Sequence, residues 1–151
     1  MIKIYSLIAL LSYCAVVLAQ TPVPPALYTD AEDIIAELER SAAERPAMAV
    51  SRIQLEDEYR INLIRRTAAA GAILHEVGHE LHYITAGAGT LVTGGVIVRG
   101  ENGAPATIQG GLERHVTAGD AILIPAGTPH WYSAVDESVS YLEVRFNVEA
   151  D

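Results

Sequence analysis

Histidine and glutamate side chains gather in one short stretch of the chain. Three of the five histidines, His75, His79 and His82, fall within eight residues of one another, beside Glu76 and Glu80. Imidazole and carboxylate groups are ligands that suit zinc, iron, manganese, nickel and copper. Residues two apart share a face of a strand, so Glu80 and His82 should point the same way, while His79 should face away or lie in a turn. The stretch therefore predicts a metal site.

A second segment, residues 119–132, brings a distant histidine into the same argument. Gly119 precedes a short apolar run, and Pro125 and Gly127 lie in the turn that leads to His130. Proline fixes φ and glycine frees it, so this turn is expected to be rigid and to direct His130 into the next strand. Imidazole and carboxylate groups facing a small barrel interior are costly without a metal or polar partners. The remaining histidine, His115, lies among charged residues and is expected to be exposed.

The elements that must position these side chains are mainly strands. Short β-branched runs alternate with polar residues, and turn signals such as Gly94-Gly95 and Glu101-Asn102-Gly103 separate them. Turns every eight to twelve residues indicate an antiparallel sandwich or barrel, an all-β fold. The strands are predicted over Val50–Leu55, Tyr59–Thr67, Ala72–His75, Glu80–Thr85, Thr90–Thr93, Val96–Arg99, Ala106–Gln109, Glu113–Thr117, Ala121–Ile124, His130–Val135 and Val139–Val148.

One amphipathic helix is predicted ahead of the strands, over about residues 30–45. Thr29 and Glu32 form a capping-box pattern, apolar residues follow at helical spacing, and Pro46 ends the element. Residues 20–28 contain three prolines and are expected to form an extended arm. The rest of the chain, residues 29–151, is expected to be a single domain that includes this helix.

The first nineteen residues have the layout of a secretory signal peptide. Lys3 precedes an apolar run of 15 residues from Ile4 to Leu18, and cleavage is expected after Ala19. The run is shorter than the roughly 20 residues of a spanning helix, so no stable membrane anchor is expected after cleavage. The sequence thus predicts an exported protein, either periplasmic or secreted.

Charge and cysteine content exclude other classes. The formal net charge is −9, which is a poor match for phosphate backbones, so no nucleic-acid partner is expected. The single cysteine, Cys14, cannot form an internal disulfide or a cysteine-based zinc site. Arg60, Arg65 and Arg66 are interpreted as decorating the barrel exterior.

Two segments of the chain resemble the cupin superfamily, in the form of a small single-domain cupin. The first contains, at the family's spacing, His75, Glu80 and Gly87; the second contains Gly119, Pro125, Gly127 and His130. The resemblance covers about residues 72–134 and implies a double-stranded β-helix, or jelly-roll, barrel. It also implies a protein that often dimerises, so a homodimer is an expectation; the helix could mediate it or simply cap the barrel's open end.

The chain departs from the family's motifs at two positions. Ile73 stands where the family has its first histidine, and Ala134 stands where it has a final asparagine. His75, Glu80 and His130 remain, a two-histidine, one-carboxylate set of the kind that binds non-haem iron. We hypothesise that His82 replaces the missing fourth ligand.

The function implied by the resemblance is that of a divalent-metal-dependent enzyme acting on a small organic molecule. Dioxygenase, lyase and isomerase chemistries are the common ones, with Fe(II) or Mn(II) favoured and Zn, Ni or Cu as alternatives. Tyr132 shares a strand face with His130 and is the candidate catalytic acid or hydrogen-bond donor. Tyr141 and Glu143 are interpreted as solvated or capping residues. The alternative is a barrel that binds a small molecule or a metal without turnover.

Overall fold

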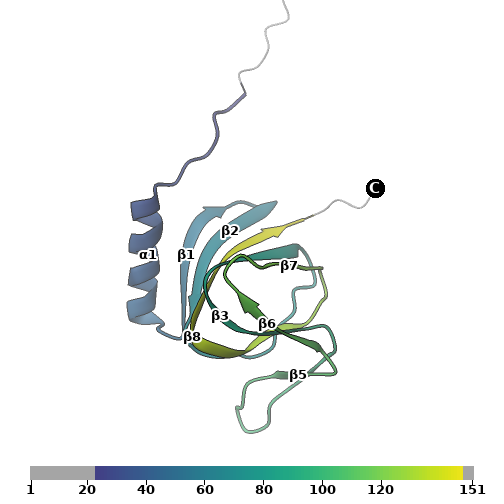
Figure 1. Cartoon of the computed structure of the whole chain (residues 1–151). Helices are drawn as coiled ribbons and strands as arrows, with labels where there is room; N and C mark the ends of the chain where they lie inside the picture. The colour runs from purple at the N-terminus through teal and green to yellow at the C-terminus, as the bar shows by residue number, and fades with distance from the viewer. Residues whose placement is uncertain (1–22, 148–151) are drawn as a thin grey trace, which may run out of the picture.

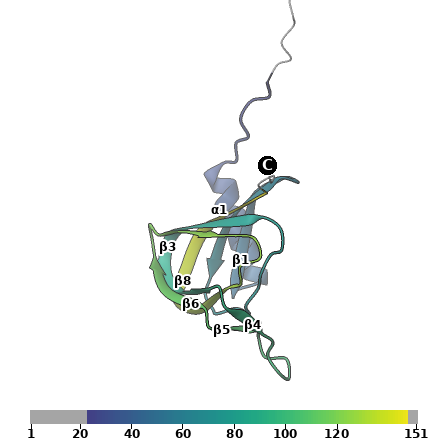
Figure 2. The same ribbon diagram turned by 90° about the vertical axis from the view of Figure 1, so that its right-hand side faces the viewer.

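Two long strands, β3 (His79–Thr93) and β8 (His130–Phe146), pair along their length and form the middle of the main sheet. The computed structural model describes residues 23–147. The main sheet is antiparallel, with strand order β1-β2-β8-β3-β6. β6 pairs with residues 88–93 of β3, and β7 pairs with residues 80–83 of the same strand. The sheet curls around an interior (Figures 1 and 2). Its other strands are β1 (Met48–Leu55), β2 (Tyr59–Arg66), β6 (Leu112–Thr117) and β7 (Ala121–Ile124). The expected all-β jelly-roll barrel with one helix is confirmed.

The predicted breaks within β3 and β8 are wrong, because each is one continuous bent strand. Gly87 has φ +70°, and a Cβ there would collide with the backbone carbonyl of Ser138. The β3–β8 register shifts on both sides of this glycine, which marks a bulge rather than the end of a strand. Bulges let a long strand turn a corner, so one strand can serve both parts of the barrel.

The turn at residues 101–103 forms the predicted hairpin. Asn102 and Gly103 both have positive φ, of 54° and 83°, and the N–H of Ala104 donates to the carbonyl of Glu101. This is a type I′ geometry, which matches the twist of paired strands. It joins β4 (Val96–Val98) to β5 (Thr107–Gln109), a small two-stranded sheet beside the barrel (Figure 2).

The helix α1 (Ala31–Glu44) lies along β1, an edge strand of the main sheet (Figure 1). Its N-cap is Asp30 rather than the predicted Thr29, whose hydroxyl instead donates to the carbonyl of Ile53. The side chains of Ser41 and Glu37 accept hydrogen bonds from backbone N–H groups of β1. The helix thus covers a sheet edge that would otherwise expose unpaired donors. Within residues 23–147, no helix combines the length and apolar character needed to cross a membrane.

The barrel interior is layered across β2, β8 and β3. One layer is apolar and consists of Ile64, Tyr141 and Ile84, which are register partners. Two residues further along each strand, the next layer is polar and contains Asn62, Glu143 and His82. A third layer contains Arg60, Arg145 and Glu80. The polar layers place charged groups inside the barrel next to its hydrophobic core.

The predicted signal peptide, residues 1–19, lies outside the described residues. Of the predicted proline arm, residues 23–28 have no helix or strand structure, and Val23 and Tyr28 are largely exposed.

Candidate metal centre

Three different elements bring the candidate ligands together. Glu80 and His82 lie on β3 and are both 2% exposed, as the strand alternation predicted. His130 is the first residue of β8 and is 5% exposed. His75 comes from the loop before β3. The predicted strand at Ala72–His75 is wrong, because only an isolated bridge at Ile73 is present there.

Backbone hydrogen bonds hold the His75 loop against the proline-rich turn. Ile73 and His130 exchange two N–H to carbonyl bonds, of 3.1 and 2.8 Å, and the N–H of Gly127 donates to the carbonyl of His75 at 2.7 Å. The turn that directs His130 therefore also fixes His75. These bonds join segments far apart in the sequence.

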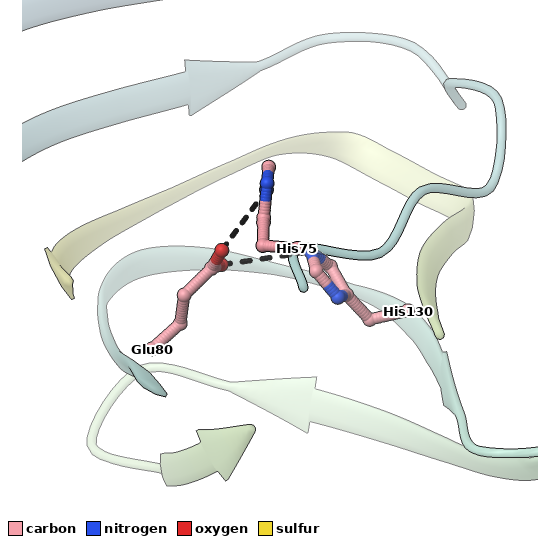
Figure 3. Close-up of side chains that lie close together, drawn as sticks. All are labelled: His75, Glu80 and His130. Atoms are coloured by element: carbon pink, nitrogen blue, oxygen red, sulfur yellow. Dashed lines mark ion pairs between the residues drawn. The ribbon is translucent and has the colours of Figure 1, made fainter. Parts of the chain in front are cut away.

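Nitrogen and oxygen atoms of three of these residues, His75, Glu80 and His130, face one another inside the barrel. The Nε2 atom of His75 lies 3.0 Å from Oε1 of Glu80, and Nε2 of His130 lies 3.5 Å from Oε2 (Figure 3). All three side chains offer a ligand atom within 4.8 Å of one another. Ligand atoms bound at about 2.1 Å and at right angles around an ion would be about 3 Å apart. The spacing therefore fits three ligands on one side of a metal ion.

Hydrogen bonds fix which nitrogen of His130 faces the cluster. Its Nδ1 atom lies 3.1 Å from the carbonyl oxygen of Thr128, which can only accept, so Nδ1 carries the proton. The lone pair of a neutral His130 is then on Nε2 and points at Glu80. Metal-binding histidines in proteins are oriented in this way by a backbone carbonyl.

His82 lies on the other side of Glu80, between this carboxylate and Tyr132. Its Nε2 atom is 3.2 Å from Oε2 of Glu80, and its Nδ1 atom is 3.3 Å from the hydroxyl of Tyr132. When the hydroxyl donates to Nδ1, the proton of His82 is on Nε2 and is donated to Glu80. His82 groups with Glu80 and Glu143 rather than with His75 and His130. The structure thus brings all four predicted residues together. In this arrangement, however, His82 donates a hydrogen bond to Glu80 instead of offering its own lone pair to the metal site.

The electrostatics favour an ionised Glu80 between neutral imidazoles. Burial opposes its ionisation, but the hydrogen bond from His82, the charge of Arg145 and, at the acid pH where the rings are protonated, the charges of His130 and His75 lower its pKa to about 2. Burial lowers the pKa of both His75 and His130, against the opposing effect of Glu80. Deprotonated imidazole and carboxylate groups are the forms that bind metal ions.

Arg145 also lies in the cluster. Its Nη2 atom is 2.8 Å from Oε1 of Glu80 and 2.8 Å from Nε2 of His75. Nevertheless, Oε1 of Glu80 and Nε of Arg145 are buried without a hydrogen bond of good geometry. Oε1 of Glu80 thus lies beside the Nε2 atom of His75, and a carboxylate oxygen beside an imidazole nitrogen fits a metal ligand set. An ion can take its place between His75 and Glu80 once the Arg145 guanidinium has moved aside.

The cluster opens on a cavity of about 290 Å³. The exterior or solvated interpretation is wrong for Arg66, Tyr141 and Glu143, which are buried and line this cavity. Arg60 also lines it but is exposed. Arg65 faces outward, as expected, and pairs with Glu39. Asn62, which donates to Glu143 at 3.0 Å, was missed altogether. The alternation of β2 places residues 60, 62, 64 and 66 on one face and could have identified this group.

Tyr132, the predicted catalytic residue, lines the same cavity and is 3% exposed. Burial raises the pKa of its hydroxyl above the ordinary value, so the group keeps its proton. It can therefore act as a donor but not as a base. As expected, His79 stays outside the cluster, where its ring lies beside Phe146, and His115 is exposed and pairs with Asp136.

Comparisons with known proteins agree with this architecture. The barrel superposes on KdgF from Halomonas sp. with a TM-score of 0.53 and 16% identity, covering 71% of this chain and 84% of that chain. It superposes on BH2720 from Bacillus halodurans with a TM-score of 0.53 and 16% identity, covering 84% and 86%. For the Fe(II) form of HppE the TM-score is 0.51 at 12% identity, covering 66% and 50%. A search of curated proteins gave no significant match.

A family match extends over the part of the chain that carries the cluster. The sequence model described as the AraC-like ligand binding domain matches residues 74–150, about half of the chain. These residues contain all four candidate ligands, and the structural neighbours show that the fold around them is the cupin barrel. The chain therefore belongs to the family of AraC-like ligand binding domains, within the cupin superfamily.

Proposed function

We propose that the protein is a divalent-metal-dependent enzyme that acts on a small organic molecule in the barrel cavity. The observation that carries this proposal is the set of facing lone pairs on His75, Glu80 and His130. All three side chains line the cavity of about 290 Å³. A substrate can therefore reach the open side of the proposed site.

The donor set favours Fe(II) or Mn(II). Two imidazoles and one carboxylate with open positions are typical of non-haem Fe(II) sites, whereas Zn, Ni and Cu bind many such sites tightly as competitors. The structural neighbour HppE is described as an Fe(II) protein, which is in keeping with this choice. A bound ion of this kind would supply a Lewis acid with free coordination positions.

The chain's own residues would hold and deliver protons beside the proposed ion. The Tyr132 hydroxyl donates to Nδ1 of His82, whose Nε2–H donates to Glu80, so the three groups form one hydrogen-bonded row. When a substrate binds, the Tyr132 hydroxyl would turn its one hydrogen bond from His82 to a substrate oxygen, and Glu143, held by Asn62, would accept a proton. This set suits a dioxygenase, lyase or isomerase type of reaction on a small molecule.

A second candidate is a barrel that binds its ligand without turnover. Arg145 already supplies a cation between His75 and Glu80, and the matched family is described as ligand-binding. In this reading the guanidinium takes the place of the ion. The ligand would still occupy the same cavity.

Turnover assays separate the two candidates. Metal-free protein, with and without added Fe(II) or Mn(II), is incubated with a panel of small organic molecules, and the products are analysed by mass spectrometry. The enzyme proposal predicts metal-dependent consumption that is lost in Glu80→Gln and kept in Glu76→Gln, an exposed glutamate nearby. A compound that binds unchanged, with or without metal, supports the second candidate instead.

We also propose export and self-association as testable properties. The export proposal rests on the sequence of residues 1–19 and predicts that the mature protein begins at Gln20, which N-terminal sequencing checks. The homodimer proposal rests on the cupin resemblance, and light scattering of the mature protein checks it. A mature chain that keeps Met1 would contradict the first, and a monomer would contradict the second.

A further inference from the structure

Arg66 is a buried arginine without a carboxylate partner. Its side chain is 9% exposed and lines the cavity. Its Nε–H donates to the hydroxyl of Tyr141 at 2.9 Å, and its guanidinium carbon lies 5.4 Å from the centre of the Tyr132 ring. Of the carboxylates in residues 23–147, none lies within 4.0 Å of this guanidinium. A buried charge without a counter-ion is costly, so its presence calls for a partner.

More arginines than carboxylates line the cavity, although the protein as a whole is negative. The chain has ten Lys and Arg residues and a formal net charge of −9. Half of these cations line the cavity: Arg66 and Arg145, which are buried or half-buried, and Arg45, Arg52 and Arg60, which are exposed. Only two carboxylates do so: Glu80, already paired with Arg145, and Glu143, which accepts from Asn62. This excess of guanidinium groups attracts small anions into the cavity.

Two of these arginines also oppose each other across neighbouring strands. Arg60 on β2 and Arg145 on β8 are register partners on the inward face. Like charges directly opposite one another destabilise a sheet. Glu80, 2.8 Å from Arg145, already offsets part of this repulsion, and an anion beside the exposed Arg60 would offset the rest.

We propose that the cavity binds a small organic carboxylate and that Arg66 is its principal counter-ion. The planar fork of an arginine forms paired hydrogen bonds with a carboxylate, and Nη1 and Nη2 of Arg66 are not engaged by Tyr141. The rings of Tyr132 and Tyr141, stacked 5.1 Å apart beside it, provide an apolar wall for the rest of the molecule. The cavity volume suits a small ligand rather than a peptide.

This inference shares the cavity of the proposed function and names its class of ligand, but it does not require a bound metal. Arg66 forms no hydrogen bond or ion pair with His75, Glu80 or His130. Carboxylate binding and metal binding are therefore separable by mutation.

The test uses matched pairs of probes that differ in one negative charge. Benzoate and benzamide, glucuronate and glucose, and acetate and acetamide are titrated into metal-free protein, and affinities are measured by calorimetry or ligand-observed NMR. We expect at least one carboxylate to bind at least about tenfold more tightly than its neutral partner. If no carboxylate binds better than its neutral partner, the proposal is overturned.

Two variants on β2 assign the effect to one side chain. Arg66→Gln should weaken binding of that carboxylate at least about tenfold, whereas Arg65→Gln, which changes the adjacent outward-facing arginine, should not. Equal binding by wild type and Arg66→Gln would overturn the assignment. Should Arg66→Gln fail to fold, Arg66→Lys, which keeps the charge but loses the fork, should still weaken binding. The Nε–H NMR signal of Arg66 can be assigned because it is absent from the spectrum of Arg66→Lys. In the wild type, this signal should shift when the carboxylate is added.

A metal titration of the same samples distinguishes this inference from the proposed function. Arg66→Gln should keep metal binding, and Glu80→Gln should lose metal binding but keep carboxylate binding. Carboxylate binding without any metal binding would leave this inference standing and remove the metal-dependent enzyme. Metal binding without carboxylate binding would overturn this inference and leave the metal-dependent enzyme standing.

Discussion

The guanidinium of Arg145 lies 2.8 Å from Oε1 of Glu80, inside the group of side chains that could hold a metal ion. The same nitrogen lies 2.8 Å from Nε2 of His75. Two of the three candidate ligands are therefore engaged by a cation that the chain itself supplies. A metal ion and Arg145 must compete for this place, since like charges repel strongly at such distances.

Removal of Arg145 is expected to strengthen metal binding. In Arg145→Gln the competing charge is absent, so the affinity for Mn(II) should rise about tenfold. Isothermal calorimetry with metal-free protein measures this change. Arg65→Gln, which removes an arginine on the barrel exterior, is the matched control and should bind Mn(II) as the wild type does. An unchanged or weaker affinity in Arg145→Gln would show that the two cations do not compete.

Substitution of His82 should cost less metal affinity than substitution of a direct ligand. Because His82 donates to Glu80 and takes a hydrogen bond from Tyr132, it positions the carboxylate. His82→Gln is expected to weaken Mn(II) binding about tenfold, and His130→Gln by more than about a hundredfold. Equal losses in the two variants would instead support our first hypothesis, in which His82 is a fourth ligand.

The metal-free protein should lose stability in acid through Glu80. Its pKa is about 2 in the folded protein against an ordinary value of 4.5, so the unfolded chain binds the proton first as the pH falls. The contribution is complete above about pH 4.5 and disappears as the pH approaches 2; it amounts to at most about 3 kcal/mol. Denaturant unfolding across this range should show a shallower loss in Glu80→Gln than in the wild type. A parallel loss in both proteins would contradict this explanation.

Alkaline pH should destabilise the protein through its buried tyrosines. Burial raises the pKa of Tyr141 to about 12, so the unfolded chain releases this proton first as the pH rises above 10. At pH 11 the wild type should have lost about 1 kcal/mol for each such tyrosine. Tyr141→Phe should lose correspondingly less between pH 8 and 11, whereas Tyr83→Phe, at an exposed position, should follow the wild type. Indistinguishable pH profiles would rule out this role for Tyr141.

The sequence predicted those parts of the site that depend on local pattern. Strand alternation placed Glu80 and His82 on one inward face, and the proline-glycine turn placed His130 at the start of the next strand. The helix and the hairpin at Asn102-Gly103 were predicted for the same reason, because capping and turn preferences act over a few residues.

Features that depend on distant contacts could not be predicted in this way. The position of His75 is fixed by hydrogen bonds to Gly127 and by the bridge between Ile73 and His130, rather than by a strand of its own. The sequence predicted two strands separated by residues 86–89, but tight packing against β8 makes Gly87 a bulge within one strand. Alternation shows that Arg60 and Arg66 share a face; it does not show that this face lines the cavity.

The most direct test of the proposed metal centre is the metal content of untagged protein. After purification and incubation with Mn(II) or Fe(II), elemental analysis should give about one equivalent for the wild type and for His115→Gln, an exposed histidine. Glu80→Gln should hold less than about a tenth of an equivalent. A wild type that binds no more than Glu80→Gln, with each of Fe, Mn, Zn, Ni and Cu, would contradict the account.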